Sequence, residues 1–268
     1  MNLFLFKDDV LRWILLFSAL IPSFGIAQEQ DDFDAQNLIK LNALPLAFGK
    51  FAVEYEHSVV NRISVGVEVG FFPKSRLPFR SIIARRPSDS AVQDLIRNFQ
   101  NSGFSVAPEV RFYISSRERL TGWYVAPYFR YATYNAMTPY AFEVSQEFMG
   151  QVVYERSDVI PISGRVDSFV GGVSIGANFK LADQWFLDCR IIGPGYGSAK
   201  GDFVGNIQLE EFEQQVLRER LADLRQDLHD FTIPIHIASE VSSDGLTINV
   251  QRSPWATLRA GLSIAYRF

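Results

Sequence analysis

Glu56, His57 and Ser58 are consecutive residues of the types that serve as acid, base and nucleophile in a hydrolase. Acyl transfer requires these three groups to contact one another. In an extended segment, neighbouring side chains point to opposite faces, so Glu56 and Ser58 would share one face and His57 would lie on the other. We therefore expect no catalytic relay here and interpret His57 as an interfacial side chain at the end of a strand.

The other two histidines, His229 and His236, lie near Asp227, Asp230 and Glu240, which together suggest metal binding. Helical zinc motifs place two histidines four residues apart on one face of the helix. This pair does not have that spacing. We expect no metal ligand in this segment.

Two further segments resemble ligand loops only in composition. Asp31, Asp32 and Asp34 lack the alternating ligand spacing of a calcium loop, so we interpret them as part of a solvated linker. The glycine-rich segment 193–197 has no lysine at phosphate-loop spacing and no helix directly after it, which favours a strand-ending turn. The sequence thus predicts no catalytic residue, no cofactor-binding residue and no metal site, and we expect a non-enzymatic protein.

Composition excludes some classes of protein. The net charge of -4 gives no indication of a nucleic-acid partner. The single cysteine, Cys189, rules out an intramolecular disulfide and is expected to be a small apolar residue of a strand.

The N-terminal segment 1–27 has the features of a secretory signal peptide. Lys7 and Arg12 precede an apolar run at 13–22, and small residues lead to a cleavage site after Ala27. The run is shorter than the roughly 20 apolar residues of a membrane-spanning helix. We expect an exported chain with a periplasmic linker at 28–36 and one β-domain at 37–268.

Beyond the linker, apolar and polar residues alternate with a period of two, which is typical of strands. In the segment 62–72, the residues Ile63, Val65, Val67, Val69 and Phe71 would share one face. Eight strands are predicted, at about 37–47, 50–58, 62–72, 103–114, 121–134, 165–181, 184–194 and 256–268.

The lengths of the predicted connections also alternate. Long loops are expected at about 73–102, 135–164 and 195–255, whereas most other connections are short. If each strand crosses to the opposite side, the long loops share one end, and the short turns and both termini share the other. Short periplasmic turns and long outer loops are the plan of an outer-membrane barrel.

Two of the long loops are expected to contain helices, at 88–100 and at 209–230. The second has an apolar stripe at helical spacing. This stripe could dock a partner or form a coiled coil, or it could pack over the mouth of the barrel or on its own loop. The stripe consists of Leu209, Phe212, Val216, Leu217, Leu221, Leu224 and Leu228.

The polar face of the predicted strands mixes small residues with charges of both signs. A soluble barrel would turn its charges to water, but a membrane barrel must turn them inward, where opposite charges pair. We therefore predict a structural charge network in the lumen, made of Glu54, Glu56, Glu68, Glu109, Arg111, Arg130, Asp188, Arg190, Arg259 and Arg267. Lys40 and Lys180 lie on the same face of their predicted strands.

Several segments carry a resemblance to a known group of proteins. They are "LIKLNALPLAFGKFAVEYEHSVVNRISVGVEVGF", "GFSVAPEVRFYIS", "GWYVAPYFRY", "GGVSIGANFKLADQWFLDCRIIGPGYG" and the terminal strand. The chain resembles small outer-membrane β-barrel proteins from Bacteroidetes, a family of unknown function. The resemblance implies an eight-stranded barrel in the outer membrane. Likeness to outer-membrane proteins in general also implies that Tyr266 and Phe268 form the signal read by the assembly machinery.

Together these features predict an all-β fold, namely an eight-stranded antiparallel transmembrane β-barrel with long, partly helical extracellular loops. We expect a surface or envelope protein with an interaction or structural role. Its partners would be outer-membrane lipid, the assembly machinery and a protein bound at the extracellular loops, with no nucleic acid. A narrow pore is the alternative, and a lipid-modifying barrel enzyme is a third hypothesis.

Overall fold

A computed structural model describes residues 36–76, 97–114, 118–148, 151–229 and 236–268, together with residues 80, 85 and 93. The predicted signal peptide lies outside the described residues, as does nearly all of the predicted linker. The same is true of most of the helix predicted at 88–100.

The described residues are mainly strands, as the period-two alternation predicted. Two helices are α2 (Ala43–Leu46) and α5 (Glu211–His229), and α5 confirms the helix expected at 209–230. No helix in the described part of the chain is both long enough and apolar enough to cross a membrane. The strands are β1 (Asn37–Asn42), β2 (Phe51–Val60), β3 (Ile63–Arg76), β4 (Gln100–Tyr113), β5 (Gly122–Phe148), β6 (Gln151–Lys180), β7 (Trp185–Asn206), β8 (His236–Ser242) and β9 (Gly245–Arg267).

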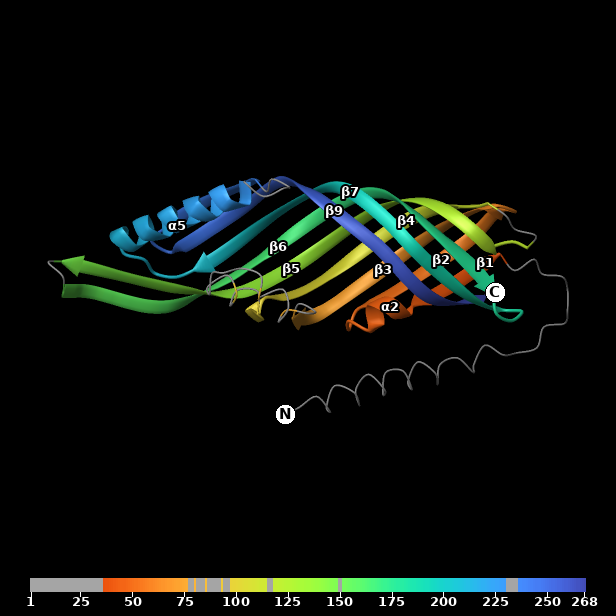
Figure 1. The fold of residues 1–268 in the computed structure, drawn as a ribbon, viewed down its shortest axis with the longest axis horizontal. Coiled ribbons are helices and arrows are strands. Elements are labelled where there is room, and N and C mark those ends of the chain that lie inside the picture. The colour runs from red at the N-terminus through yellow and green to blue at the C-terminus, as the bar shows by residue number, and fades with distance from the viewer. Residues whose placement is uncertain are drawn as a thin grey trace, which may run out of the picture. The chain divides into compact units, whose positions relative to one another are not determined.

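Eight of these strands form a closed antiparallel ring (Figure 1). The order runs from β1 to β7 and then to β9, which pairs back with β1. The two ends of the described chain meet at this closure, where the N–H of Phe268 donates to the carbonyl of Asn37 over 3.0 Å. The prediction of eight antiparallel strands is confirmed.

The closure of the ring is staggered. Leu41 of β1 pairs with Ile264 of β9, but a path of paired residues leading from Leu41 round the other strands arrives at Pro254 of β9. This offset of about ten residues requires strands that are tilted against the ring axis, typically by about 35–45°. The path passes through Val53, Val69, Val106, Tyr131, Phe169 and Ser198.

The first strand is shorter than predicted. β1 ends at Asn42, and the residues 43–46 that were expected to continue it form α2. The Asn42 side chain accepts the N–H of Leu44 over 3.2 Å and so caps α2. Pro45 lacks an N–H and cannot donate to a strand ladder, which favours leaving the sheet here.

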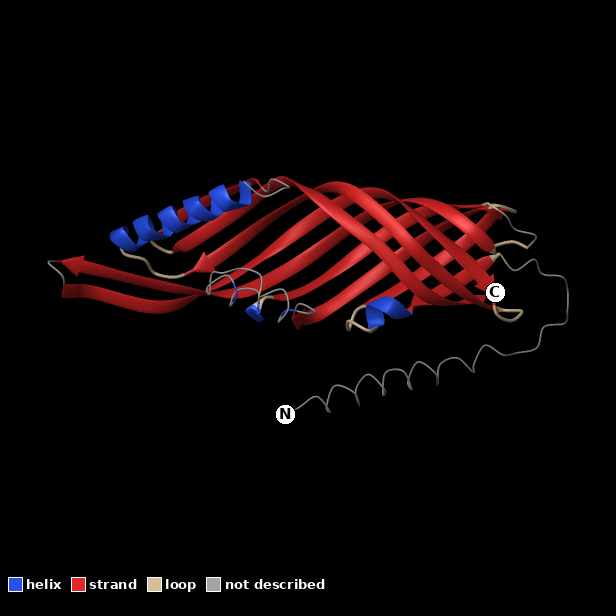
Figure 2. Cartoon of the chain, in the orientation of Figure 1, coloured by secondary structure: helices blue, strands red, loops and turns tan. Residues whose placement is uncertain are grey.

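Two of the predicted loops are in large part strands (Figure 2). Residues 135–164 are not a loop, because β5 and β6 continue through them to Phe148 and from Gln151. Within 195–255, β7 continues to Asn206 and β9 begins at Gly245. These parts of the strands extend beyond the ring. We call the described residues of 138–162 and 200–252 the extension.

The extension has its own hydrophobic core. The apolar side of α5 packs against β5, β6 and the start of β9, so the helix packs both on its own predicted loop, 195–255, and on the second predicted loop, 135–164. The core contains Phe142, Val144, Ile160, Leu209, Leu217, Leu221 and Leu246. Phe212 and Val216 of the predicted stripe pack against it, whereas the side chains of Leu224 and Leu228 lie outside the described residues.

In the ring, apolar side chains face outward and polar side chains face inward. On β3, Ser64 is fully buried, whereas Val65 and Val69 are each 42% exposed and Phe71 is 55% exposed. A ring that packed like a soluble barrel would show the opposite distribution. We call the end with residues 61–62, 118–121 and 181–184 the turn end, and the other the extension end.

Candidate functional site

The interior of the ring contains a layer of buried charges between an apolar plug and a small cavity. The plug lies at the turn end and consists of Leu38, Tyr113, Leu120, Tyr124, Ala126, Phe186 and Ala265. The charges occur on inward positions of β1, β2, β3, β4, β7 and β9 because inward residues recur at every second position. Stacking these strands in one ring brings residues far apart in sequence into contact.

Lys40 lies at the centre of the layer. Its Nζ is 2.5 Å from Asp188 Oδ2 and 3.1 Å from Glu54 Oε1, and it also contacts Glu56. The ammonium is fully buried. Moving such a charge out of water costs several kcal/mol, which close carboxylate partners must offset.

Arg111 is the second buried cation of the layer. Its Nε donates to Glu109 Oε1 over 2.6 Å, and its two terminal nitrogens bind Asp188 and Glu54. The guanidinium also stacks on Tyr124, with Cζ 4.2 Å from the ring centroid. Arg111 therefore joins carboxylates from three strands, which its planar fork of donors suits.

Arg190 and Arg259 continue the layer toward the extension end. Arg190 binds Glu68 and Glu54, each over 2.8 Å, and Glu109 over 2.9 Å. Arg259 Nη1 binds Glu109 over 3.1 Å. Every carboxylate of the layer thus has at least one cationic partner.

Tyrosine hydroxyls complete the hydrogen bonding on the side of the plug. Tyr124 donates to Asp188 Oδ1 and Tyr113 donates to Glu56 Oε1, each over 2.8 Å, and Ser64 also donates to Glu56. Hydrogen bonds from such donors fix the orientation of the buried carboxylates. These partners were not among the predicted site residues, although their inward positions follow from the alternation.

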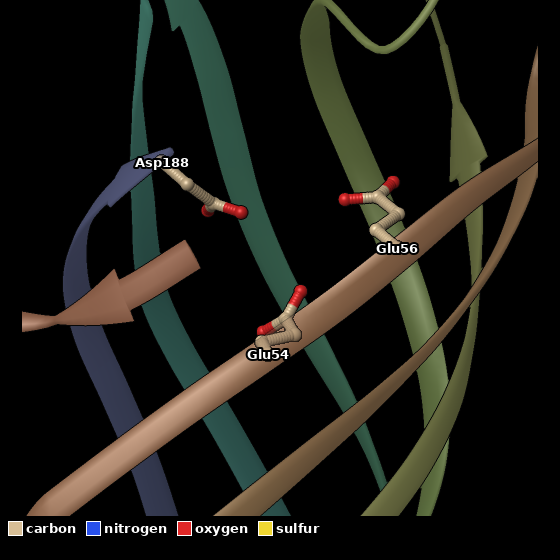
Figure 3. Close-up of side chains that lie close together, drawn as sticks. All are labelled: Glu54, Glu56 and Asp188. Carbon is tan, nitrogen blue, oxygen red and sulfur yellow. The ribbon is translucent and has the colours of Figure 1, made fainter. Parts of the chain in front are cut away.

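Three carboxylates of the layer come close enough to ligate a metal (Figure 3). Glu54 and Glu56 from β2 and Asp188 from β7 point toward a common space, with ligand oxygens within 4.8 Å of one another. Lys40 contacts all three, and Arg111 binds Glu54 and Asp188. A cation is therefore already supplied by the chain, and the arrangement favours an ion-pair network over a metal site.

The structure brings eight of the ten predicted network residues into this layer. The other two lie apart from it. Arg267 binds Glu118 over 2.8 Å at the turn end, where Lys180 also binds Glu118 over 3.1 Å. Arg130 lies toward the extension end, and its Nη2 is 3.4 Å from Ser105 Oγ. The eight in the layer are Glu54, Glu56, Glu68, Glu109, Arg111, Asp188, Arg190 and Arg259.

The histidine and serine of β2 do not meet. Glu56 and Ser58 are buried, and Ser58 Oγ is 3.4 Å from the carbonyl of Val60. His57 Nδ1 is instead 2.9 Å from Asn37 Oδ1. The side chains of His229 and His236 lie outside the described residues.

The glycine-rich segment 193–197 is not a strand-ending turn, because β7 runs through it. Its glycines leave room for large inward side chains of other strands. A Cβ on Gly195 would lie 2.5 Å from the Tyr128 hydroxyl and 2.7 Å from Val170. Close packing explains this composition without a phosphate ligand.

The two residues of the predicted assembly signal lie beside the closure of the ring. The rings of Tyr266 and Trp185 have centroids 5.2 Å apart, and the Tyr266 hydroxyl is 3.1 Å from Gln184 Oε1. Phe268 is 53% exposed. Tyr266 thus pairs with Trp185 at the turn end, and Phe268 lies at the closure itself.

The sequence matches one family, described as "Protein of unknown function (DUF3575)", over residues 14–216. No curated protein and no solved structure matches the chain. The match includes β1 to β6, all of β7 and the start of α5. Since it covers well over half of the sequence, the chain belongs to the DUF3575 family.

Proposed function

We propose that this chain is a membrane-spanning β-barrel of a bacterial outer membrane with a closed interior, and that its extension carries an interaction surface. The observation that supports this most directly is the inverted ring, with exposed apolar side chains outside and paired charges inside. In hydrocarbon, backbone groups must be paired within the protein, and a closed ring of strands does this.

Aromatic residues at two levels of the outer surface support a membrane position. At the turn end, the register aligns Tyr55, Ile39, Tyr266 and Trp185 in one row across four strands. Toward the extension end, it aligns Phe51, Phe71 and Phe104, and it pairs Tyr131 with Phe169. Aromatic girdles at both interfaces are typical of membrane barrels.

The charge layer supports a closed interior over a narrow pore. Its ion pairs cross the ring, and the apolar plug lies between them and the turn end. An eight-stranded barrel has room for little more than its own side chains. We expect no steady ion conductance in planar bilayers, and reproducible channels would contradict a closed interior.

The membrane position can be tested with two matched substitutions on β6. Val173 and Val159 both face outward and are 46% and 56% exposed, but Val173 lies in the ring and Val159 in the extension. A charge on the lipid face near the bilayer midplane costs about 2–4 kcal/mol. We expect Val173→Arg to impair folding into liposomes, measured by resistance to protease, and Val159→Arg to fold like the wild type.

In a soluble protein, both substitutions would be surface changes with little effect. Equal folding of the two variants, together with a chain that stays monomeric without detergent, would remove the membrane assignment. The signal peptide is tested separately, by the N-terminal residue of the exported chain.

An interaction role for the extension is supported by its position at the end of the ring opposite Asn37 and Phe268. Val153 and Val159 are exposed there, at 60% and 56%. A photoactivatable residue at position 159 should capture a protein partner in intact cells, whereas the same residue at 173 should capture lipid. Capture of lipid alone at both positions would contradict an interaction role.

A further inference from the structure

The small cavity next to the charge layer, on its extension side, has a volume of about 120 Å³. Arg130, Arg190 and Arg259 line it, together with one carboxylate, Glu68. Three guanidinium groups around so small a space form an environment suited to an anion.

The three arginines around this cavity differ in their partners. Arg190 and Arg259 bind carboxylates of the layer. Arg130 has no carboxylate within ion-pair distance among the described residues, where its Nη2 donates to Ser105 Oγ over 3.4 Å. A further cation, Lys50, lies with its Nζ 5.1 Å from the ring centroid of Phe72, which also lines the cavity.

Three buried nitrogen atoms of these arginines lack a hydrogen-bond acceptor within the described structure. They are Nε of Arg130, Nε of Arg190 and Nη2 of Arg259. Arg259 Nη2 lies 3.3 Å from Glu68 but without hydrogen-bond geometry. Arg190 and Arg259 are each only 5% exposed. Because buried donors are nearly always paired, unpaired ones around a cavity indicate a missing acceptor.

The cavity reaches the outside of the ring beside the short first strand. β1 pairs with β9 only as far as Asn42 and Ser263, and β8 pairs with β9 only from Gly245 to Gln251. Between these stretches, no described strand pairs with the edge of β9 that faces away from β7. The wall of the cavity here is apolar and comes from α2 and β9, through Pro45, Leu258 and Ala260.

We propose that this cavity binds an oxyanion, the phosphate or carboxylate head of an amphiphile, whose chain leaves the ring between α2 and β9. The oxyanion would accept from the unpaired nitrogens, and Arg130 would balance its charge. The apolar wall suits an alkyl chain. Only the lipid source of the amphiphile rests on the proposed membrane position; binding of the oxyanion does not.

The size of the cavity is compatible with this ligand class. The space of about 120 Å³ is larger than a single water molecule needs and has room for a phosphate or carboxylate group. Water alone could satisfy the donors, but it would not supply the negative charge that Arg130 lacks.

Isothermal titration calorimetry tests the proposal by measuring ligand affinity for the chain purified in dodecyl maltoside. The probes are inorganic phosphate, dodecyl phosphate and, as a neutral control, dodecanol. We expect dodecyl phosphate to bind and dodecanol not to bind. Because charge-assisted hydrogen bonds are strong, Arg130→Gln should weaken binding at least about tenfold. Arg130→Lys should retain most of it, and Arg165→Gln, at an exposed site outside the ring interior, should leave it unchanged.

The two phosphate probes and the variant Ala260→Trp distinguish an amphiphile from a free anion as the source of the oxyanion. Dodecyl phosphate binding that Ala260→Trp abolishes, with phosphate binding retained, assigns an amphiphile that enters between α2 and β9. Equal binding of both phosphates, insensitive to Ala260→Trp, keeps the oxyanion site but assigns a free anion. The proposal is overturned if neither phosphate binds, or if correctly folded Arg130→Gln binds dodecyl phosphate as the wild type does. None of these outcomes depends on the comparison of Val173→Arg with Val159→Arg.

Discussion

Lys40 Nζ lies 2.5 Å from Asp188 Oδ2, although 148 residues separate them and β9 lies between their strands in the ring. The contact therefore crosses the interior. It links the strand that opens the ring with the one that precedes the closing strand, so the charge layer and the closure of the ring stabilise one another.

Removing the central cation should be costly. Lys40→Met leaves Glu54, Glu56 and Asp188 with fewer cationic partners, and uncompensated buried charge typically costs about 3–5 kcal/mol. We expect this loss in the free energy of unfolding, measured by urea titration in micelles with tryptophan fluorescence. Lys200→Met, at an exposed position of β7, is the matched control. A change below about 1 kcal/mol for Lys40→Met would show that the layer is dispensable.

The hydroxyl of Tyr124 should contribute to the free energy of unfolding separately from its ring. Tyr124→Phe keeps the stacking on Arg111 but removes the donor to Asp188, and a buried acceptor that loses its partner costs about 1–3 kcal/mol. The same urea titration applies. Tyr131→Phe also removes a hydroxyl, but from the exposed bond to Asp167, and should be close to neutral. Equal effects of the two substitutions would contradict a special role for the buried bond.

The glycines of β7 should tolerate substitution only where there is space. Gly195→Ala places a methyl group 2.5 Å from the Tyr128 hydroxyl, and overpacking typically costs about 1–3 kcal/mol. The double variant with Tyr128→Phe should recover part of that loss. Gly171→Ala on β6 meets only ordinary contacts with Phe129, at 3.6 Å, and serves as the control. Equal stability of both alanine variants would refute the packing explanation.

Docking of α5 should weaken in acid. Burial favours the neutral form of Glu213, but the N–H of Glu210 and hydrogen bonds from Tyr154 and Arg156 outweigh it and hold the pKa of Glu213 below its usual value. A lowered pKa in the folded state means that the stabilisation is complete above the unfolded pKa of about 4.3 and is lost as the pH falls through the folded pKa.

Hydrogen exchange measures this effect directly. Amides of α5 should lose protection as the pH falls below about 4, and Glu213→Gln should remove that part of the pH dependence. Glu211→Gln, at an exposed position in the same first turn of α5, should keep the wild-type pH dependence. Wild-type pH dependence in Glu213→Gln would assign the effect to other groups.

The alternation of residue types determined most of the wall of the ring. It identified which residues of each strand share a face, and hence the candidates for the charge layer. It also gave the eight strands of the ring but not β8, and the helical spacing of apolar residues gave the helix at 209–230. These features are local, because a strand repeats every two residues and a helix about every 3.6.

The extent of the strands could not be obtained in the same way. β5 and β6 continue through 135–164 because α5 covers the inner side of the extension, and that contact joins segments about 60 residues apart. The sequence of either segment alone carries no record of such partners.

Sequence alone placed Lys40, Arg111 and Arg130 on the same polar face, but the predicted network included the two arginines and left out Lys40. Only the tertiary structure decided that Lys40 is the centre of the layer, that Arg111 joins three strands, and that Arg130 faces a cavity without a carboxylate partner. The physical reason is that alternation fixes the direction of a side chain, whereas its partners depend on the stagger with which the ring closes.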